Sequence, residues 1–275
     1  IFIRIVIKKL ALYSNKITKP NYFLYHHSIQ YTFSAAIFCN RNTSNKQQIQ
    51  LFCPDFKNSD YAELQTKKEK ETILTFKNAF AYNGIPATRN NFIKQTSKAK
   101  VVHIATHLVV DTINPLKSTL IFQPSSTQAY TLSIDNIKKL KLNAQLITLA
   151  ACKSSFGKNN FGEGLLNFSW SFYFAGAHNI LTTRWNAADK TTDNIIADFY
   201  LFLKEGKTKS QAIQLAKIKY LETADAIGAQ PFFWANFALN GDASAININT
   251  SSMQKYWWIS FVVLLFFMVI NIQLK

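Results

Sequence analysis

With 275 residues, the chain is long enough for one large domain with appendages. Hydrophobic residues make up 48% of it and charged residues 17%, a balance that excludes global disorder. The formal net charge of +16 is spread along the chain without a long basic run, an RNA-binding aromatic motif or zinc-finger spacing. Nucleic-acid binding is therefore disfavoured, and an anionic membrane surface is the better partner for this charge.

The N-terminal part alternates short predicted elements. The chain opens with Ile1 rather than Met, which is typical of a fragment, so any upstream partner domains would be out of view. Residues 1–45 are expected to form short strands and turns, with a strand pair at 22–33. A short apolar strand follows at 49–53. The spacing of Ile73, Phe76 and Phe80 predicts a helix over 61–82, ended by Asn83 and Gly84, and a short helical piece is expected at 90–95.

The central and C-terminal parts show strands alternating with helices. Residues 100–107 and 144–152 are apolar runs of strand length, as in buried parallel strands. A helix at 133–141 lies between them, within enough chain for a right-handed crossover. The remaining predictions are a Gly-containing loop at 154–164, helices at 165–175, 191–204 and 210–223, and strands at 178–185 and 232–239. This order predicts an α/β domain with a mostly parallel sheet flanked by helices.

The last twenty residues carry the strongest segment-level signal. The run YWWISFVVLLFFMVI (256–270) has no charge, and 19 positions from 256 to 274 would span about 29 Å as a helix. Aromatic residues begin this segment, and Lys255 and Lys275 flank it, as at membrane interfaces. We therefore predict a domain at 1–245, a polar linker at 246–255 and a transmembrane helix at 256–274. The alternative is a buried C-terminal helix or strand.

Cysteine usage indicates a reducing compartment. The three residues Cys39, Cys53 and Cys152 show no paired spacing, which argues against a disulfide framework and against a Cys-rich zinc site. No secretory signal is visible at the start of the chain.

Three polar or aromatic residues end predicted strands. His107, Cys152 and Trp185 each close an apolar run, and the carboxyl ends of strands in an open α/β sheet gather ligands. An imidazole next to a thiol can take its proton or stabilise the thiolate. Taken singly, each residue also has a purely structural interpretation: Cys152 would be a buried packing residue, and His107 a hydrogen-bonded structural residue. Together they predict a Cys–His dyad.

Rival motifs fail on their spacing or composition. His103 and His107 have the i, i+4 spacing of a zinc helix, but Ile104 stands where Glu is needed and the segment is a predicted strand. The run GKNNFG (157–162) begins like a phosphate-binding loop, yet Glu163 replaces the required Lys. No G-x-S-x-G elbow of a serine hydrolase occurs. We expect neither a metal nor a cofactor.

Eight sequence blocks follow one another along the chain: GIPAT (84–88), HIATH (103–107), LAAC (149–152), FGEGLLN (161–167), AGAHNILTTRWNAAD (175–189), FYLFLKEG (199–206), QAIQLA (211–216) and PFFWANFALNGD (231–242). In this order they resemble the CHAT domains, caspase-like relatives of separase often found beside tetratricopeptide repeats. The resemblance runs from about residue 22 to 242. The gap of 45 residues between His107 and Cys152 is similar to the roughly 50 of caspases.

The resemblance implies a cysteine endopeptidase with His107 as general base and Cys152 as nucleophile. The family usually has Gly after the catalytic His, whose backbone N–H lies in the oxyanion hole. Leu108 stands there and also carries an N–H, and the amide of Cys152 is a second donor candidate. After the Cys, the sequence Lys-Ser-Ser matches the family's Glu-Thr-Gly only loosely.

Substrate selection is expected at the loop after the third strand. The loop that begins at Trp185 resembles the separase segment whose acidic residue meets a basic P1 side chain, which makes Asp189 a candidate for the S1 pocket. The alternative is that Asp189 is the N-cap of the helix that begins near Thr191.

The expected partners follow from these predictions. They are a protein substrate, upstream tetratricopeptide repeats or a partner protein, and a membrane reached through the C-terminal helix, with the catalytic domain facing the cytoplasm. Two alternatives stay open: a weakly active or inactive CHAT module that binds partners, and a membrane-tethered nucleic-acid binder based on charge alone, which salt-dependent binding would reveal.

Overall fold

The computed structural model describes residues 2–5, 22–32, 46–111, 113–153, 163–185 and 188–248, with backbone only for 2–5, 151–153 and 163–167. The strands are β1 (Phe2–Ile5), β2 (Ile29–Thr32), β3 (Gln48–Cys53), β4 (Ala79–Asn83), β5 (Ala99–Val109), β6 (Thr119–Ile121), β7 (Thr131–Ser133), β8 (Leu146–Lys153), β9 (Asn179–Thr183) and β10 (Phe237–Gly241). The helices are η1 (Phe23–Tyr25), α2 (Lys67–Leu74), α3 (Arg89–Thr96), η2 (Pro115–Lys117), α4 (Ile134–Lys138), α5 (Glu163–Phe174), α6 (Asp189–Lys204), α7 (Lys209–Thr223) and α8 (Pro231–Trp234).

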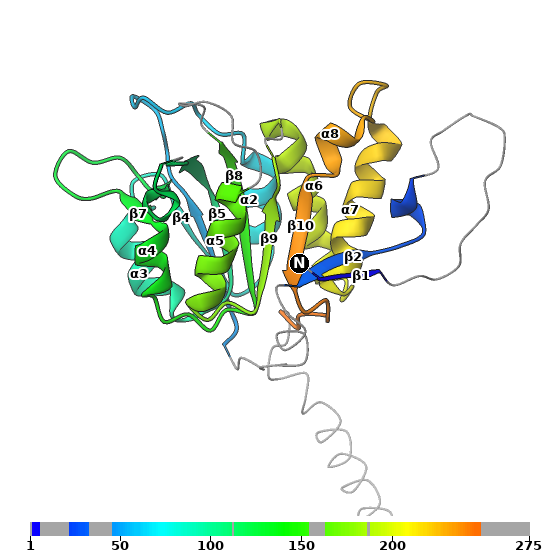
Figure 1. The fold of residues 1–275 in the computed structure, drawn as a ribbon, viewed down its shortest axis with the longest axis horizontal. Helices are drawn as coiled ribbons and strands as arrows, with labels where there is room; N and C mark the ends of the chain where they lie inside the picture. Colours follow the sequence, from blue (N-terminus) through cyan, green and yellow to red (C-terminus); the bar gives the residue numbers. More distant parts are fainter. Residues whose placement is uncertain are drawn as a thin grey trace, which may run out of the picture.

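One sheet organises the molecule (Figure 1). Its strand order is β1-β2-β10-β9-β8-β5-β3-β4, and β6 and β7 extend from β5. The neighbours β4, β3, β5, β8 and β9 run parallel, whereas β10 is antiparallel to β9, and β1 to β2. The structure therefore confirms a mixed α/β fold with a mostly parallel sheet.

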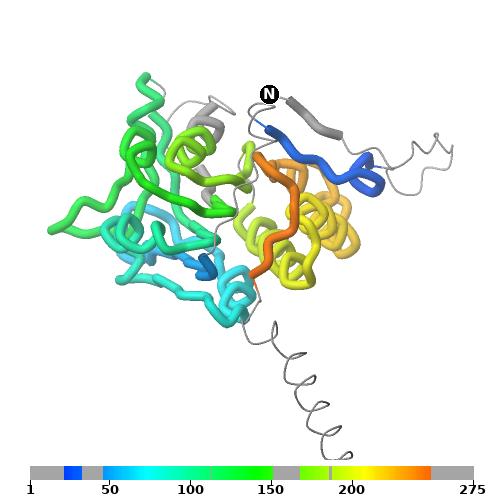
Figure 2. Tube along the Cα trace, turned by 90° about the horizontal axis from the view of Figure 1, so that it is seen from below, coloured from blue at the N-terminus to red at the C-terminus, as the bar shows by residue number. Residues whose placement is uncertain are grey.

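Helices cover both faces of this sheet, in two groups that Figure 2 also separates. On one face, α2, α6 and α7 bury apolar side chains such as Ile73, Phe199 and Ile213 against the sheet. On the other face, α3, α4 and α5 do the same with side chains such as Phe92, Ile137 and Phe172. The long apolar runs of β5 and β8 are buried because both of their faces are covered.

Local signals explain where several helices begin. Thr88 and Ser133 each accept a hydrogen bond from a backbone N–H three residues later, at the starts of α3 and α4. Thr208 and Gln211 form a reciprocal capping box at the start of α7. These caps satisfy amides that have no partner inside the helix.

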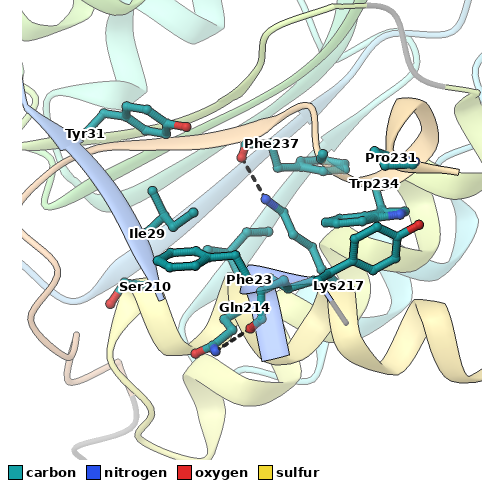
Figure 3. A pocket seen from close by; sticks show the side chains of 13 residues that line it. Phe23, Ile29, Tyr31, Ser210, Gln214, Lys217, Pro231, Trp234 and Phe237 are labelled. Carbon is teal, nitrogen blue, oxygen red and sulfur yellow. Dashed lines mark hydrogen bonds between the residues drawn. The ribbon is translucent and has the colours of Figure 1, made fainter. Parts of the chain in front are cut away.

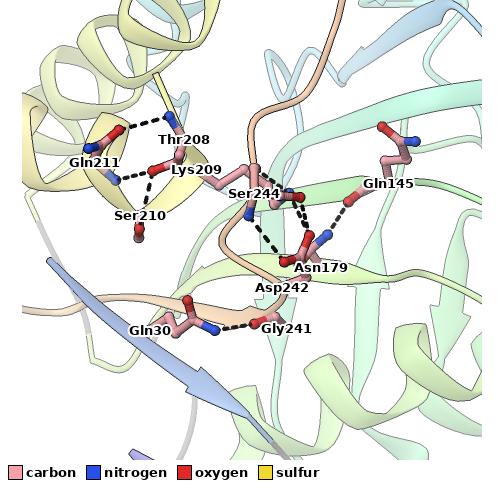
Figure 4. A network of polar contacts seen from close by, with 10 residues as sticks. All are labelled: Gln30, Gln145, Asn179, Thr208, Lys209, Ser210, Gln211, Gly241, Asp242 and Ser244. Atoms are coloured by element: carbon pink, nitrogen blue, oxygen red, sulfur yellow. Dashed lines mark hydrogen bonds and ion pairs between the residues drawn. The ribbon is translucent and has the colours of Figure 1, made fainter. Parts of the chain in front are cut away.

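The chain after β10 is held by a polar network (Figure 4). The buried Lys209 donates from Nζ to the carbonyl oxygen of Ser244 at 2.6 Å, and Asp242 Oδ2 lies 3.6 Å from the same nitrogen. Gly241 has φ of +114°, and a Cβ there would approach the carbonyl oxygen of His178 to 2.4 Å. Glycine is therefore required where β10 passes β9.

Three predicted elements differ from the observed ones. The helix predicted over 61–82 is the shorter α2 followed by β4. Phe80, whose spacing from Ile73 and Phe76 suggested the helix, is half-exposed on this edge strand. The strand pair predicted at 22–33 is η1 followed by β2. The final strand predicted at 232–239 begins as α8, because Pro231 is suited to the first turn of a helix, and continues as β10.

The predicted transmembrane helix at 256–274 and the linker beyond residue 248 lie outside the described residues. Within the described ranges, no helix combines the length and the hydrophobicity needed to cross a membrane.

Candidate active site

The parallel strands β5 and β8 bring His107 and Cys152 together. Their backbones pair in register along eight positions, and His107 is the partner of Cys152. Thr106 and Ala105 pair with Ala151 and Ala150 immediately before them. The predicted dyad therefore lies on neighbouring strands, near their carboxyl ends. The side chain of Cys152 is outside the described part of the structure.

A loop between β3 and α2, residues 54–66, encloses the His107 imidazole. The Phe56 ring meets it edge-on with centroids 4.5 Å apart, and the Tyr61 ring stacks on it at 5.5 Å. The carbonyl oxygen of Ala62 lies 2.6 Å from His107 Nε2. His107 is only 4% exposed as a result of its surroundings.

The Ala62 contact determines which imidazole nitrogen carries the proton. A backbone carbonyl only accepts hydrogen bonds, so Nε2 must donate, and Nδ1 of the neutral ring is left unprotonated. Among the described residues, this buried Nδ1 has no hydrogen-bond partner. A buried lone pair without a donor is available to accept a proton from a nearby acid.

His103, four residues earlier in β5, belongs to a different environment. It is fully buried, with Nε2 3.5 Å from Glu69 Oε2 and Nδ1 3.3 Å from the Tyr200 hydroxyl. That hydroxyl donates to Thr148 Oγ1 at 3.0 Å. Burial raises the pKa of the Glu69 carboxyl, and the neighbouring His103 opposes the rise. These contacts join α2 and α6 to β5 and β8, four residues before the predicted site along each strand.

The thiols differ in their environments. Cys53 ends β3 with its side chain buried, and this burial raises the pKa of its thiol far above the ordinary value. Such a thiol is a poor nucleophile, because the thiolate is the reactive form. Cys39 lies outside the described residues.

A family comparison places the chain. A family model described as the CHAT domain matches residues 10–242, most of the chain. The chain belongs to the CHAT domain family.

Solved structures resemble this CHAT domain in fold at low sequence identity. They include the complex of Porphyromonas gingivalis RgpB pro- and mature domains, at 14% identity and TM-score 0.49. The Arg-specific cysteine proteinase gingipain R (RgpB) matches at 13% and 0.46, and the Saccharomyces cerevisiae separase–securin complex at 13% and 0.46. The alignments cover 73%, 73% and 74% of this chain but 48%, 47% and 12% of those chains, so the CHAT domain spans less than half of each. No curated protein matches.

The other predicted site residues of the CHAT domain lie on neighbouring elements. Trp185 follows β9, donates from Nε1 to the Phe232 carbonyl oxygen at 2.8 Å and stacks on the Phe232 ring. Leu108 lies inside β5 between β6 and β8, with its side chain buried. That the Leu108 amide donates to an oxyanion stays a prediction.

Asp189 is not an N-cap. It is the first residue of α6, and the N-cap position belongs to Ala188, which makes no side-chain capping bond. The helix therefore begins two residues before the predicted start at residue 191. Asp189 is half-buried in the first turn, and its role in an S1 pocket stays a prediction.

The residues that enclose His107 were missed by the sequence analysis. Phe56, Tyr61 and Ala62 lie in a loop, and part of it was assigned to a helix. Ala62 acts through its backbone carbonyl, so its side chain gives no signal. The loop of 13 residues between β3 and α2 is long enough to suggest a functional role, but the predicted helix from residue 61 hid its length.

Proposed function

We propose that this CHAT domain is a cysteine endopeptidase that cleaves a protein substrate, with Cys152 as nucleophile and His107 as general base. The register of β5 and β8, which pairs these two residues, is the observation that carries the proposal. Paired residues of adjacent strands lie about 4.8 Å apart and share a face of the sheet. The Nδ1 atom of His107, which has no hydrogen-bond partner among the described residues, supports the same assignment.

The chemistry follows from the protonation state that Ala62 imposes. The Cys152 thiol gives its proton to His107 Nδ1, and the thiolate sulfur attacks the carbonyl carbon of the scissile bond. The C–N bond of the resulting oxyanion breaks as the imidazolium protonates the leaving amine. His107 then takes a proton from water, and the water oxygen attacks the thioester carbon. The C–S bond breaks, the acid leaves, and the imidazolium returns its proton to the Cys152 thiolate. The imidazolium is stabilised throughout by the Ala62 carbonyl.

We further propose that Asp189 selects a basic P1 side chain. Asp189 follows β9, which pairs directly with the Cys152 strand, and its first-turn position leaves the carboxylate half-buried. A partly desolvated carboxylate favours Arg through two parallel hydrogen bonds.

The second candidate is a CHAT module that binds a partner protein without cleaving it. The 4% exposure of His107 favours this alternative, because a substrate must reach the imidazole. Leu108, in place of the family's usual Gly, favours it as well.

Peptide-library profiling separates these candidates. We expect the wild-type chain to cleave after Arg, Cys152→Ala to cleave nothing, and Asp189→Asn to lose the preference for Arg while keeping the fold. Cleavage after Leu or Met that Asp189→Asn leaves unchanged would refute the basic-P1 proposal alone. Cleavage that survives Cys152→Ala would refute the peptidase assignment.

We also propose that residues 256–274 anchor the domain to a membrane, with the domain on the cytoplasmic side. The uncharged run from Tyr256 to Ile270 supports this proposal. The full chain should then stay with the membrane fraction after carbonate extraction, and a chain ending at Ser252 should be soluble. A full chain that is soluble without detergent would refute the anchor.

A further inference from the structure

A pocket of about 340 Å³ lies beside β2 and β10, towards the opposite end of the sheet from β3 and β4. Figure 3 shows the side chains that line it. It is bounded by η1, β2, α7, α8 and the start of β10. Five aromatic side chains belong to its lining: Tyr22, Phe23, Tyr31, Trp234 and Phe237. In the sheet, β9 separates β10 from the Cys152 strand, so this pocket does not include the dyad.

The walls of the pocket are tied to one another. Gln214 of α7 donates from Nε2 to the Leu24 carbonyl oxygen of η1 at 2.7 Å, which fixes η1 on the helix. Tyr22 meets Trp234 edge-on with ring centroids 4.9 Å apart, and both side chains donate to the Ala229 carbonyl oxygen. These contacts join η1, near the start of the chain, to α7 and α8, which lie about 190 or more residues later, and they fix the walls of the cavity. A preformed cavity needs little ordering on binding.

One cation projects into this aromatic lining. Lys217 extends from α7, and its Nζ donates to the Phe237 carbonyl oxygen at 2.9 Å (Figure 3). An ammonium has three N–H donors, so two remain beyond this bond. Within the described ranges, Lys217 forms no ion pair with a carboxylate.

A second cation adds to the positive potential here. Arg184, just after β9, places its guanidinium 4.3 Å from the centre of the Tyr31 ring, and it too has no acidic partner in the described part of the chain. Burial, and then the charge of Arg184, lower the pKa of Lys217 to about 7. A bound anion would offset both effects.

We propose that this pocket binds a small amphipathic carboxylate whose aromatic or aliphatic body fills the cavity and whose carboxylate pairs with Lys217. Aromatic walls bury the apolar body, and the single ammonium with free donors matches one carboxylate. A phosphate group fits less well, because the Gln214 amide already donates to Leu24 and the lining offers few other donors. The site is independent of peptidase activity.

Calorimetric titration of the full chain with 2-naphthoate tests the proposal. We expect binding to the wild type, at least roughly tenfold weaker binding to Lys217→Met, and unchanged binding to Lys219→Met. Lys219 is the matched control, because it lies on the same helix with its side chain half-exposed in an ion pair with Asp198. Absence of binding at millimolar naphthoate, or equal binding to both variants, would overturn the proposal.

Two measurements on the wild type avoid any dependence on a folded variant. The neutral isostere 2-naphthamide should bind at least roughly tenfold more weakly than 2-naphthoate, since it lacks the charge that pairs with Lys217. Naphthoate should also slow acetylation of Lys217 but not of Lys219, as mapped by mass spectrometry. Equal affinity for 2-naphthoate and 2-naphthamide would mean an apolar site that does not recognise the anion. An unchanged rate of Lys217 acetylation would mean that the ligand binds elsewhere. Either result would refute the proposal.

Discussion

At the scale of single residues, burial decides which charged groups the fold can tolerate. Lys209 is 2% exposed, and its ammonium is held by the Ser244 carbonyl and by Asp242 (Figure 4). Burial lowers the pKa of Lys209 to about 8, and Asp242 opposes that change. The network holds the chain after β10 against α7. Because the charged ammonium of Lys209 is costly to bury, the folded state favours the neutral amine more than the unfolded chain does.

This pKa predicts how stability changes with pH. Between pH about 8 and about 10.4 the unfolded chain holds the Lys209 proton more tightly than the folded chain, so the free energy of unfolding rises with pH in this window. Below pH about 8, Lys209 is protonated in both the folded and the unfolded chain, so its contribution to the free energy of unfolding does not change with pH. Urea unfolding at pH 7.5 and pH 10 should show wild type gaining on the order of 2 kcal/mol relative to Lys209→Met. Parallel pH profiles of the two proteins would contradict the prediction.

At the scale of elements, the loop that encloses His107 depends on a cap from another helix. The N-cap of α2, Thr66, makes no side-chain capping bond. Asp193 of α6 accepts hydrogen bonds instead from the backbone N–H groups of Glu69 at 2.7 Å and Lys68 at 3.1 Å. A negative charge at a helix N-terminus is also favoured by the helix dipole. Asp193 thus fixes the end of the loop that carries Ala62.

Removing this cap should affect both stability and the site. Asp193→Ala should lower the free energy of unfolding by about 1–2 kcal/mol and slow alkylation of Cys152, because the Ala62 carbonyl loses its support. Asp198→Ala is the control on the same helix: its ion pair with Lys219 is partly exposed, so it should cost less than about 1 kcal/mol and leave alkylation unchanged. Unfolding by urea and mass-spectrometric labelling measure the two effects. Equal labelling rates for Asp193→Ala and wild type would show that α2 does not position the loop.

The sequence predicted the elements whose signal is local and missed those that depend on long-range contacts. β5 and β8 were found because both are buried on two faces and are rich in apolar residues over the length of a strand. β4 was missed because an edge strand with an exposed Phe80 has no such run. The cap from Asp193 could not be predicted, because it joins residues more than 120 positions apart.

The site shows the same division. His107 and Cys152 were predicted from their types and their positions at strand ends, and the sheet register brings them together. The Ala62 carbonyl, which sets the tautomer of His107, is a backbone group that any residue could supply. The Lys217 pocket depends on η1, α7 and α8 meeting, and no motif in the sequence marks that meeting.

At the scale of the whole molecule, the sheet order separates two regions with different chemistry. The candidate active site lies at β5, β8 and the start of the chain after β9, in the middle of the sheet. The Lys217 pocket lies beyond β9, where β10 and β2 meet α7. The helices α6 and α7 span both regions, because α6 carries the Asp193 cap and packs against α7, which carries Lys217.

The central claim is that His107 activates Cys152, and site-resolved alkylation with iodoacetamide tests it most directly. We predict that Cys152 of the full chain reacts at least roughly tenfold faster than Cys39 or Cys53, and that His107→Ala removes most of this difference. Cys53 is an internal reference, because its thiol is buried and its pKa is raised. Equal labelling of all three thiols, unaffected by His107→Ala, would contradict the account.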